Sequence, residues 1–263
     1  MQLQGKRCLI VGATSGIGLA AARAFLAEGA RLVVAGHEPQ QGASALASLG
    51  HADRTHFVAC DATVSGEVVA LFRAAVSYLR GLDVLYHVAG SSGRGRGDGP
   101  LHECRDDGWQ FTLDANLKST FLTNRAAVCH FLGQRQPGAI LNMASVLALA
   151  PSPRHFDTAA YAAAKGGVIA LSRAAAARYA ADGIRVNVLA PGLVDTPMAA
   201  RAVQDPATRA YLRGKQPLAG GPATPDDCSG AAVFLCSDAG RLVTGVVLPV
   251  DAGWCVSEGQ SRE

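Results

Sequence analysis

The sequence predicts an α/β protein with one doubly wound parallel sheet of about seven strands and helices on both faces. Short apolar or β-branched runs alternate with helical stretches along the 263 residues. These runs are hydrophobic almost throughout, as expected for strands that helices cover on both faces. Strands that alternate with helices pair in parallel through right-handed crossovers. The expected strands are 7–11, 31–35, 55–60, 84–88, 139–143, 185–189 and 246–250.

The helical stretches are expected at 17–28, 38–49, 64–80, 107–133, 158–181 and 225–237. The last has the clearest start, because the cap residue Thr224 precedes Pro225 and two acidic residues. The stretch 196–223 is less regular and contains several prolines, so we expect one or two short helices there. We find no linker and expect a single domain over 1–263, with a loose polar tail at 257–263.

A glycine-rich turn follows the first expected strand. Gly12, Gly16 and Gly18 follow the apolar run 8–11 and lead into the first helix. Glycines permit a tight turn and a close approach of the backbone to a pyrophosphate, and the free N–H groups of the next helix attract the phosphates. Glycine spacing alone would mean little, but the order of strand, turn and helix indicates a Rossmann-like dinucleotide site.

Tyr161 and Lys165 lie four positions apart in the helical stretch 158–181, so their side chains project from one face. A free tyrosine has a pKa near about 10, and an ammonium group close by favours the phenolate. The pair therefore suits acid/base chemistry, and we expect the pKa of Tyr161 to be lowered. On its own, such a pair is also typical of the solvated surface of an alanine-rich helix.

Ser145 follows the strand expected at 139–143, where that strand emerges at the carboxyl edge of the sheet. Ligands bind at this edge in doubly wound sheets. A lone serine after a strand is more often a turn former or a helix cap than a catalytic donor. Its value as a site residue therefore depends on the residues that accompany it.

The glycine turn, Ser145, Tyr161 and Lys165, in this order, resemble the short-chain dehydrogenase/reductase family in its GxxxGxG and YxxxK form. The resemblance spans about residues 5–253, and the number of ordered matches argues against chance. The further matches are Asp61, Ala89-Gly90, Asn116, Pro191-Gly192, Thr196, Thr244-Gly245 and the run 251–253.

This resemblance implies hydride transfer between a nicotinamide and a secondary alcohol or ketone, with no metal. It also implies that the stretch 196–223 covers the substrate. Tyr161 would be the general acid or base, Ser145 would hydrogen-bond the substrate oxygen, and Lys165 would hold the nicotinamide ribose and keep the Tyr161 pKa low. Asn116 would interrupt its helix and use its backbone carbonyl to hold a water near Lys165. Without these companions, Asn116 would be an amide on a helix surface.

The cofactor contacts that the resemblance implies come from the carboxyl ends of several strands. Asp61 would accept a hydrogen bond from the adenine amino group, although an aspartate after a strand also forms turns. Pro191-Gly192 would turn the chain beside the nicotinamide, and is otherwise an ordinary turn. The full expected set is Gly12, Thr14, Ser15, Gly16, Ile17, Gly18, Gly36, His37, Asp61, Ala62, Val88, Ala89, Gly90, Tyr161, Lys165, Pro191, Gly192, Val194 and Thr196.

Three segments depart from the family pattern. Val88 stands where the family usually has an asparagine that ties neighbouring strands together, so the local stability and the adenosine side are in doubt. The loop 145–161 is a few residues longer than usual and carries Arg154 and His155, which are candidates for an anionic substrate group. The loop 91–99 is rich in glycine, so we expect it to be flexible and to order on binding, with Arg94 and Arg96 solvated.

The choice of cofactor depends on the residues after the second strand. Gly36 stands where NAD-selective relatives usually carry an acidic residue, so NADP(H) is not excluded. Ser15 replaces a basic residue in the turn, and His37 is mostly neutral at pH 7. Glu38 suits ribose binding and the first turn of a helix equally well. We expect NAD or NADP with weak discrimination and a small preference for NADP(H).

The composition sets broader limits. A charged fraction of 17% and a net charge of +3 without a basic run give no case for nucleic acid or membrane binding, and the low charge suits burial between subunits. Seven cysteines, an odd number without a CxxC pair, favour reduced thiols in the cytoplasm. No apolar run suggests a secretory or membrane-spanning segment. We expect a cytoplasmic homotetramer that pairs through helices near 107–133 and 158–181.

The favoured function is therefore an NAD(P)-dependent alcohol dehydrogenase or ketoreductase with a small-molecule alcohol or ketone substrate. The alternatives are a nucleotide-binding regulatory protein without turnover, and an epimerase or dehydratase that uses the cofactor transiently. A protein that only binds nucleotide has no need of a phenol beside its lysine, which argues against the first alternative. The substrate itself cannot be read from the sequence, because loops build its pocket.

Overall fold

A computed structural model describes residues 1–259 of the chain. It contains one parallel sheet in the order β3-β2-β1-β4-β5-β6-β7, which confirms the predicted fold class and every expected strand. The chain moves outward from β1 to β3 and then returns to β4, so the strand order reverses between β1 and β4. The strands are β1 (Arg7–Val11), β2 (Arg31–Gly36), β3 (Thr55–Ala59), β4 (Val84–His87), β5 (Gly138–Met143), β6 (Ile184–Pro191) and β7 (Val247–Val250).

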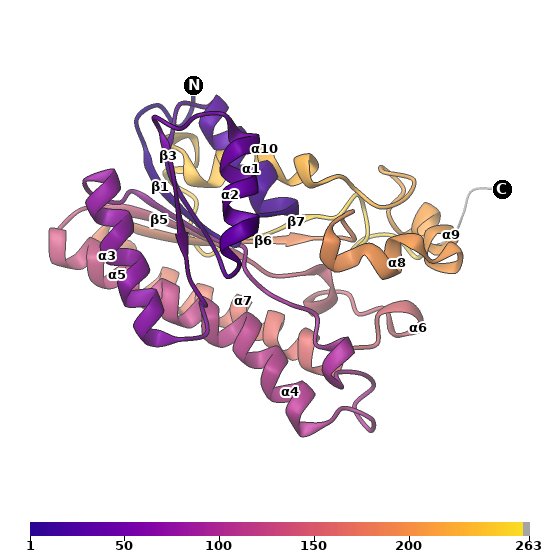
Figure 1. The fold of residues 1–263 in the computed structure, drawn as a ribbon. Helices are drawn as coiled ribbons and strands as arrows, with labels where there is room; N and C mark the ends of the chain where they lie inside the picture. Colours follow the sequence, from indigo (N-terminus) through magenta and orange to yellow (C-terminus); the bar gives the residue numbers. More distant parts are fainter. Residues whose placement is uncertain (260–263) are drawn as a thin grey trace.

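Helices cover both faces of this sheet (Figure 1). One face carries α1 (Gly16–Ala27), α2 (Pro39–Leu49) and α10 (Ser229–Cys236), and the other carries α3 (Ser65–Leu79), α5 (Ser119–Gln134) and α7 (Ala159–Tyr179). Neighbouring residues of one strand enter different cores: Ile10 packs under α1 and α10, whereas Leu9 packs under α3 and α5. Because both sets are buried, the strands are apolar throughout, which explains why their sequence signal is strong.

The long helix expected over 107–133 is divided in the structure. It consists of α4 (Asp106–Leu113), a π-helical segment at Asp114–Lys118, and α5. The helix expected at 225–237 begins as a 3-10 turn at Pro225–Cys228 and continues as α10. Thr224 and Asp227 form a capping box at its start, which confirms the predicted helix signal.

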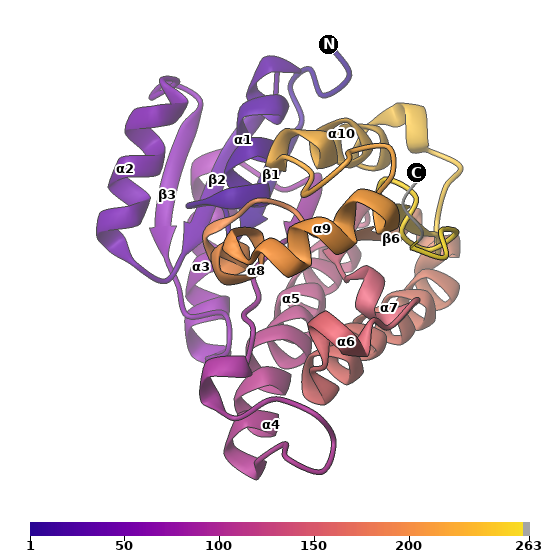
Figure 2. The same cartoon turned by 90° about the vertical axis from the view of Figure 1, so that its right-hand side faces the viewer.

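The stretch 196–223 contains a 3-10 turn at Pro197–Ala199, α8 (Ala200–Gln204) and α9 (Pro206–Lys215). The long loop after β5 contributes α6 (Pro153–Phe156), and α6, α8 and α9 lie together at one end of the molecule (Figure 2). The His155 ring stacks on Tyr211 of α9 at 4.6 Å between centroids, and the Ser152 hydroxyl donates to the Tyr211 hydroxyl at 2.9 Å. The extra residues of this loop therefore pack against α9.

The tail expected to be loose begins with anchored residues. The Ser257 hydroxyl donates to the Gly214 carbonyl at 2.6 Å, and Lys215 donates to the Ser257 carbonyl. Residues 260–263 lie outside the described part of the chain. Within residues 1–259, no helix is both long and apolar enough to cross a membrane.

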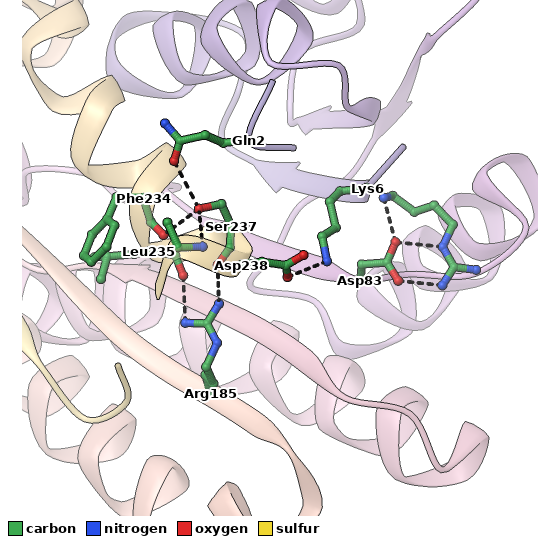
Figure 3. A network of polar contacts seen from close by, with 10 residues as sticks. Gln2, Lys6, Asp83, Arg185, Phe234, Leu235, Ser237 and Asp238 are labelled. Atoms are coloured by element: carbon green, nitrogen blue, oxygen red, sulfur yellow. Dashed lines mark hydrogen bonds and ion pairs between the residues drawn. The ribbon is translucent and has the colours of Figure 1, made fainter. Parts of the chain in front are cut away.

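Polar contacts tie together the amino-terminal edge of the sheet, opposite the ligand edge (Figure 3). The Arg7 guanidinium binds both oxygens of Asp83, at 2.9 Å and 2.6 Å, and so joins β1 to the start of β4. Lys6 binds Asp238 at 2.8 Å, and Arg185 donates to the Leu235 carbonyl at 2.9 Å. These contacts join the starts of β1, β4 and β6 to one another and to the end of α10.

Candidate active site

A cavity of about 1210 Å³ opens at the carboxyl edge, where the strand order reverses. Its lining comes from the glycine turn, the residues after β3, β4, β5 and β6, the start of α7, and α8. This is the position at which doubly wound sheets bind nucleotides. The fold therefore places residues from distant parts of the sequence around one site.

The glycine turn has the geometry that a pyrophosphate requires. Gly12 has a φ of +88°, and a Cβ there would lie 2.5 Å from the Ala89 nitrogen. A Cβ on Gly18 would lie 2.0 Å from the Gly12 carbonyl oxygen, so a side chain at either position would displace the turn. The first turn of α1 has no acidic residue and Ser15 makes no side-chain cap bond, so its N–H groups are left for an anion.

Ser145, Tyr161 and Lys165 meet in this cavity. Tyr161 and Lys165 are one turn apart on α7, and Lys165 Nζ lies 5.6 Å from the centroid of the Tyr161 ring. Lys165 is only 2% exposed and donates to the Met143 carbonyl at 2.9 Å. Ser145 caps a 3-10 turn, where its hydroxyl accepts from the Leu147 N–H at 3.2 Å. The serine is thus both a helix cap and a cavity residue.

The pKa of Tyr161 shifts opposite to our expectation. Burial raises it to about 12, and the hydrogen bond with Ser145 offsets only part of this effect. Burial also lowers the pKa of Lys165 to about 8. The predicted lowering by Lys165 was wrong because desolvation penalises both charged forms. In the protein alone, Tyr161 is therefore a neutral phenol near pH 7.

Asn116 lies in the π-helical segment and is fully buried behind the cavity wall. Its amide nitrogen donates to the carbonyls of Ser91 and Thr112, both at 2.8 Å. Its backbone carbonyl, expected to hold a water, accepts from the Thr120 hydroxyl at 2.7 Å. Asn116 is thus absent from the cavity lining, although it approaches Lys165 across Gly90: a Cβ built there would lie 2.5 Å from Asn116 Oδ1 and 3.2 Å from Lys165 Nζ.

Asp61, the residue expected to contact the adenine, lies in the cavity wall and also forms a turn. It lines the cavity, and its carboxylate accepts from the Thr63 N–H at 2.9 Å and the Thr63 hydroxyl at 2.7 Å, which forms a turn. Burial opposes ionisation, but the Thr63 hydrogen bonds outweigh it and hold the Asp61 pKa below its ordinary value. Thr14 does not line the cavity; its side chain covers Gly36, where a Cβ would lie 2.6 Å from Thr14 Cγ2.

His87, the residue before Val88, links β4 to α5. The His87 ring is fully buried, with Nδ1 2.9 Å from the Thr123 hydroxyl and Nε2 3.3 Å from the Ser119 hydroxyl. Burial and the charge of Lys165 lower the His87 pKa to about 3, so the ring is neutral. The N–H groups of Val88 and Ala89 both donate to the Val11 carbonyl, at 2.8 Å and 2.9 Å. Backbone geometry at this position is therefore retained.

The loop 91–99 is held in place, contrary to our expectation of flexibility. Asp98 is 3% exposed, and its carboxylate accepts from the N–H groups of Ala160 and Tyr161, each at 3.0 Å. Arg94 donates to the Asp157 carbonyl at 3.2 Å. The glycines let the loop bend back onto the start of α7, where the carboxylate caps the helix. Sequence reasoning missed Asp98, because its partners lie 62 and 63 positions away.

The cavity lining also revises the expected anion contacts. Arg154 and His155 do not line it, because α6 turns them toward solvent and α9. Arg94, Arg96 and Arg201 line it instead, together with the apolar side chains of Leu147, Phe156, Met198 and Trp254. Apart from Thr14 and Asn116, every expected catalytic and cofactor-binding residue lines the cavity, namely Gly12, Ser15, Gly16, Ile17, Gly18, Gly36, His37, Asp61, Ala62, Val88, Ala89, Gly90, Ser145, Tyr161, Lys165, Pro191, Gly192, Val194 and Thr196.

A dinucleotide-sized cavity at the switch point, with an open glycine turn and a tyrosine–lysine pair, defines the class of nicotinamide-dependent α/β oxidoreductases. Comparisons with known proteins agree. A family model described as Enoyl-(Acyl carrier protein) reductase matches residues 12–255. The chain belongs to the short-chain dehydrogenase/reductase family and is an NAD(P)-dependent alcohol dehydrogenase or ketoreductase.

Its relatives include dehydrogenases of varied substrates. The chain is 37% identical over 261 residues to 3beta-hydroxysteroid dehydrogenase 1 of Eggerthella lenta, covering 98% of this chain and 96% of the relative. It is 37% identical over 250 residues to cis-4-hydroxycyclohexanecarboxylate dehydrogenase of Sinomonas cyclohexanicum, covering 94% and 95%. A solved short-chain type dehydrogenase/reductase from Mycobacterium ulcerans is similar, with a TM-score of 0.89, 26% identity, and coverage of 98% and 92%.

Proposed function

We propose that Tyr161 is the general acid in ketone reduction and the general base in alcohol oxidation. The observation that carries this assignment is the meeting of Ser145, Tyr161 and Lys165 in one cavity with the open glycine turn. Ser145 orients the substrate oxygen toward the Tyr161 hydroxyl, which passes its proton to that oxygen in reduction. The Lys165 ammonium stabilises the phenolate that remains. Asn116 supports this arrangement from behind Gly90.

The residues of the cavity fit a nicotinamide dinucleotide. We assign the pyrophosphate to the glycine turn at the start of α1, the adenosine to Asp61 and the nicotinamide ribose to Lys165. Gly12, Gly18, Asp61 and Lys165 all line the cavity, which supports this assignment. When bound, the nicotinamide supplies or accepts the hydride. The cofactor-binding role of the cavity residues named above is part of this proposal.

We infer a small preference for NADP(H) over NAD(H). Gly36 offers no carboxylate to repel a 2′-phosphate, and His37 lines the cavity beside it. The Glu38 carboxylate lies 3.1 Å from His37 Nδ1, and its negative charge repels a 2′-phosphate. Because His37 and Glu38 act in opposite directions, the discrimination between the two cofactors is weak.

We propose a carbocyclic secondary alcohol, or the corresponding ketone, as substrate. The two curated relatives above are both named for a hydroxyl group on a ring compound. The substrate end of the cavity has an apolar wall of the matching kind, built by Leu147, Phe156, Met198 and Trp254. One relative is named for a steroid and the other for a carboxylate, so these names do not decide the charge of the substrate.

The experiment that tests the catalytic assignment is Tyr161→Phe. We expect kcat to fall about 10²–10⁴-fold, the usual contribution of proton transfer, while cofactor affinity is retained. Tyr179→Phe, on the same helix but outside the cavity, is the matched control and should keep its activity. A Tyr161→Phe enzyme with more than about a tenth of wild-type kcat, and chemistry rate-limiting, contradicts the assignment.

A net change in nicotinamide absorbance with a panel of ketones also distinguishes a dehydrogenase from a nucleotide-binding protein without turnover and from an epimerase or dehydratase.

We also propose a cytoplasmic homotetramer that assembles through α4, α5 and α7. Exposed Ala163, Ala170, Ala174 and Ala177 form one face of α7, and the large side chains of Trp109, Phe121 and Leu132 are exposed on α4 and α5. Small side chains permit close approach of helices from a second subunit. All seven cysteines are free thiols, which supports a reducing compartment. A mass near 27 kDa by light scattering at micromolar concentration would exclude the assembly.

A further inference from the structure

Arg94 and Arg201 line the cavity from different elements. Arg94 belongs to the 3-10 turn Arg94–Arg96 in the loop after β4, and Arg201 belongs to α8. Both line the same cavity as Tyr161 and Ser145. Arg94 donates to the Asp157 carbonyl at 3.2 Å, four residues before Tyr161, which places it at the catalytic end of α7. Arg94 is thus close to the reacting groups and is held by a backbone contact.

Neither arginine is neutralised by the protein. Within residues 1–259, Arg94 and Arg201 make no ion pair, and Arg201 makes no side-chain hydrogen bond. Asp98, the nearest buried acid of the loop, is committed to the N–H groups of α7. Burial and the positive charge of Arg201 lower the pKa of Arg94, more than Asp98 and Asp157 raise it. The positive charges of Arg94 and Arg201 therefore repel each other in the cavity, and an anion bound between them relieves this repulsion.

The other arginines near the site have different surroundings. Arg96 also lines the cavity, but its guanidinium lies over the Phe111 ring at 5.1 Å, so an aromatic contact already engages it. Arg154 is exposed on α6 and does not line the cavity. Within residues 1–259, Arg94 and Arg201 are thus the arginines of the cavity wall that have neither an ion pair nor an aromatic contact.

We propose that Arg94 and Arg201 form an anion subsite that binds a carboxylate of the substrate, so that the enzyme acts on hydroxy and oxo carboxylic acids. This inference rests on the proposed function, since it names the substrate class of that site. Guanidinium groups bind carboxylates through paired, charge-assisted hydrogen bonds. Phe156 and Trp254 line the same cavity and offer an apolar surface for the carbon skeleton of the substrate. Two fixed ends then hold the carbinol or carbonyl carbon against the catalytic residues.

The test compares two ketones of similar shape, the anionic 4-oxocyclohexanecarboxylate and the neutral 4-oxocyclohexanecarboxamide, with purified enzyme and either reduced cofactor. We expect kcat/KM to favour the carboxylate roughly 10- to 100-fold, the range for a hydrogen bond to a charged group. Arg94→Gln and Arg201→Gln should each reduce this ratio toward one. Arg154→Gln is the matched control and should leave the ratio and the activity unchanged.

A binding measurement separates the failure of this inference from failure of the proposed function. The cofactor-loaded enzyme is titrated with cyclohexanecarboxylate and with cyclohexanecarboxamide, which cannot react at the ring. Tighter binding of the carboxylate, lost in Arg201→Gln, supports the subsite even if no ketone is reduced. Equal binding of both compounds overturns it even if ketones are reduced. A higher KM for the cofactor in Arg201→Gln, with an unchanged ratio of the two ketones, would assign Arg201 to the cofactor and also overturn the proposal.

Discussion

Replacement of Asp98 tests how the loop after β4 supports the catalytic helix. Thr158, the residue at the N-cap of α7, makes no side-chain cap bond, so Asp98 supplies this function from the loop. Its carboxylate holds the N–H of Tyr161 itself at 3.0 Å. We therefore expect Asp98 to position the catalytic tyrosine as well as to stabilise the fold.

The magnitude follows from the two hydrogen bonds. Loss of a cap costs about 0.5–2 kcal/mol, and loss of a negative charge at a helix N-terminus costs a further ~0.3–1 kcal/mol. Asp98→Ala should thus lower the free energy of unfolding by about 1–3 kcal/mol, which corresponds to a fall in Tm of roughly 2–12 °C. Asp98→Asn keeps one acceptor oxygen and should lose about half as much.

The kinetic effect distinguishes positioning from stability alone. If the start of α7 shifts, kcat should fall about 10-fold or more, because small misplacements of a reacting group are costly, while KM for the cofactor stays near wild type. Asp106→Ala removes an exposed acid from the first turn of α4 and is the matched control. Chemical unfolding and steady-state kinetics check both effects. Full kcat in a folded Asp98→Ala enzyme, below its transition temperature, would refute the positioning argument.

Two further predictions concern pH and cofactor. Ketone reduction should decline above about pH 8, because burial lowers the Lys165 pKa to about 8 and the ammonium that stabilises the phenolate is lost. Alcohol oxidation should instead rise with pH, because it needs the Tyr161 phenolate and burial raises the Tyr161 pKa to about 12. Profiles of kcat in both directions check this, and a reduction rate constant from pH 7 to 10 contradicts it. Glu38→Gln should increase the preference for NADPH, and in both enzymes kcat/KM for NADPH relative to NADH should grow as pH falls toward 6 if His37 binds the phosphate. A pH-independent preference for NADH of about a hundredfold or more would overturn the proposed preference for NADP(H).

The strands and the divided helix near Asn116 differ in how far local sequence could predict them. The strands were predictable because each is buried on both faces, so its apolar run carries the signal by itself. The division of the helix near Asn116 was expected only from the family resemblance. Its cause is three-dimensional, since the Asn116 side chain bonds the Ser91 carbonyl in the loop after β4.

The sequence by itself determined the doubly wound sheet, the glycine turn and the Tyr161–Lys165 pair, because each rests on residues that are close together in the chain. Only the tertiary structure decided the direction of the Tyr161 pKa, since burial depends on what packs around the phenol. It also decided that Asp98 caps α7 and that Arg94 and Arg201 share one cavity wall. These residues come from separate loops and helices, and their contacts exist only once the sheet has brought the carboxyl ends of its strands to one edge.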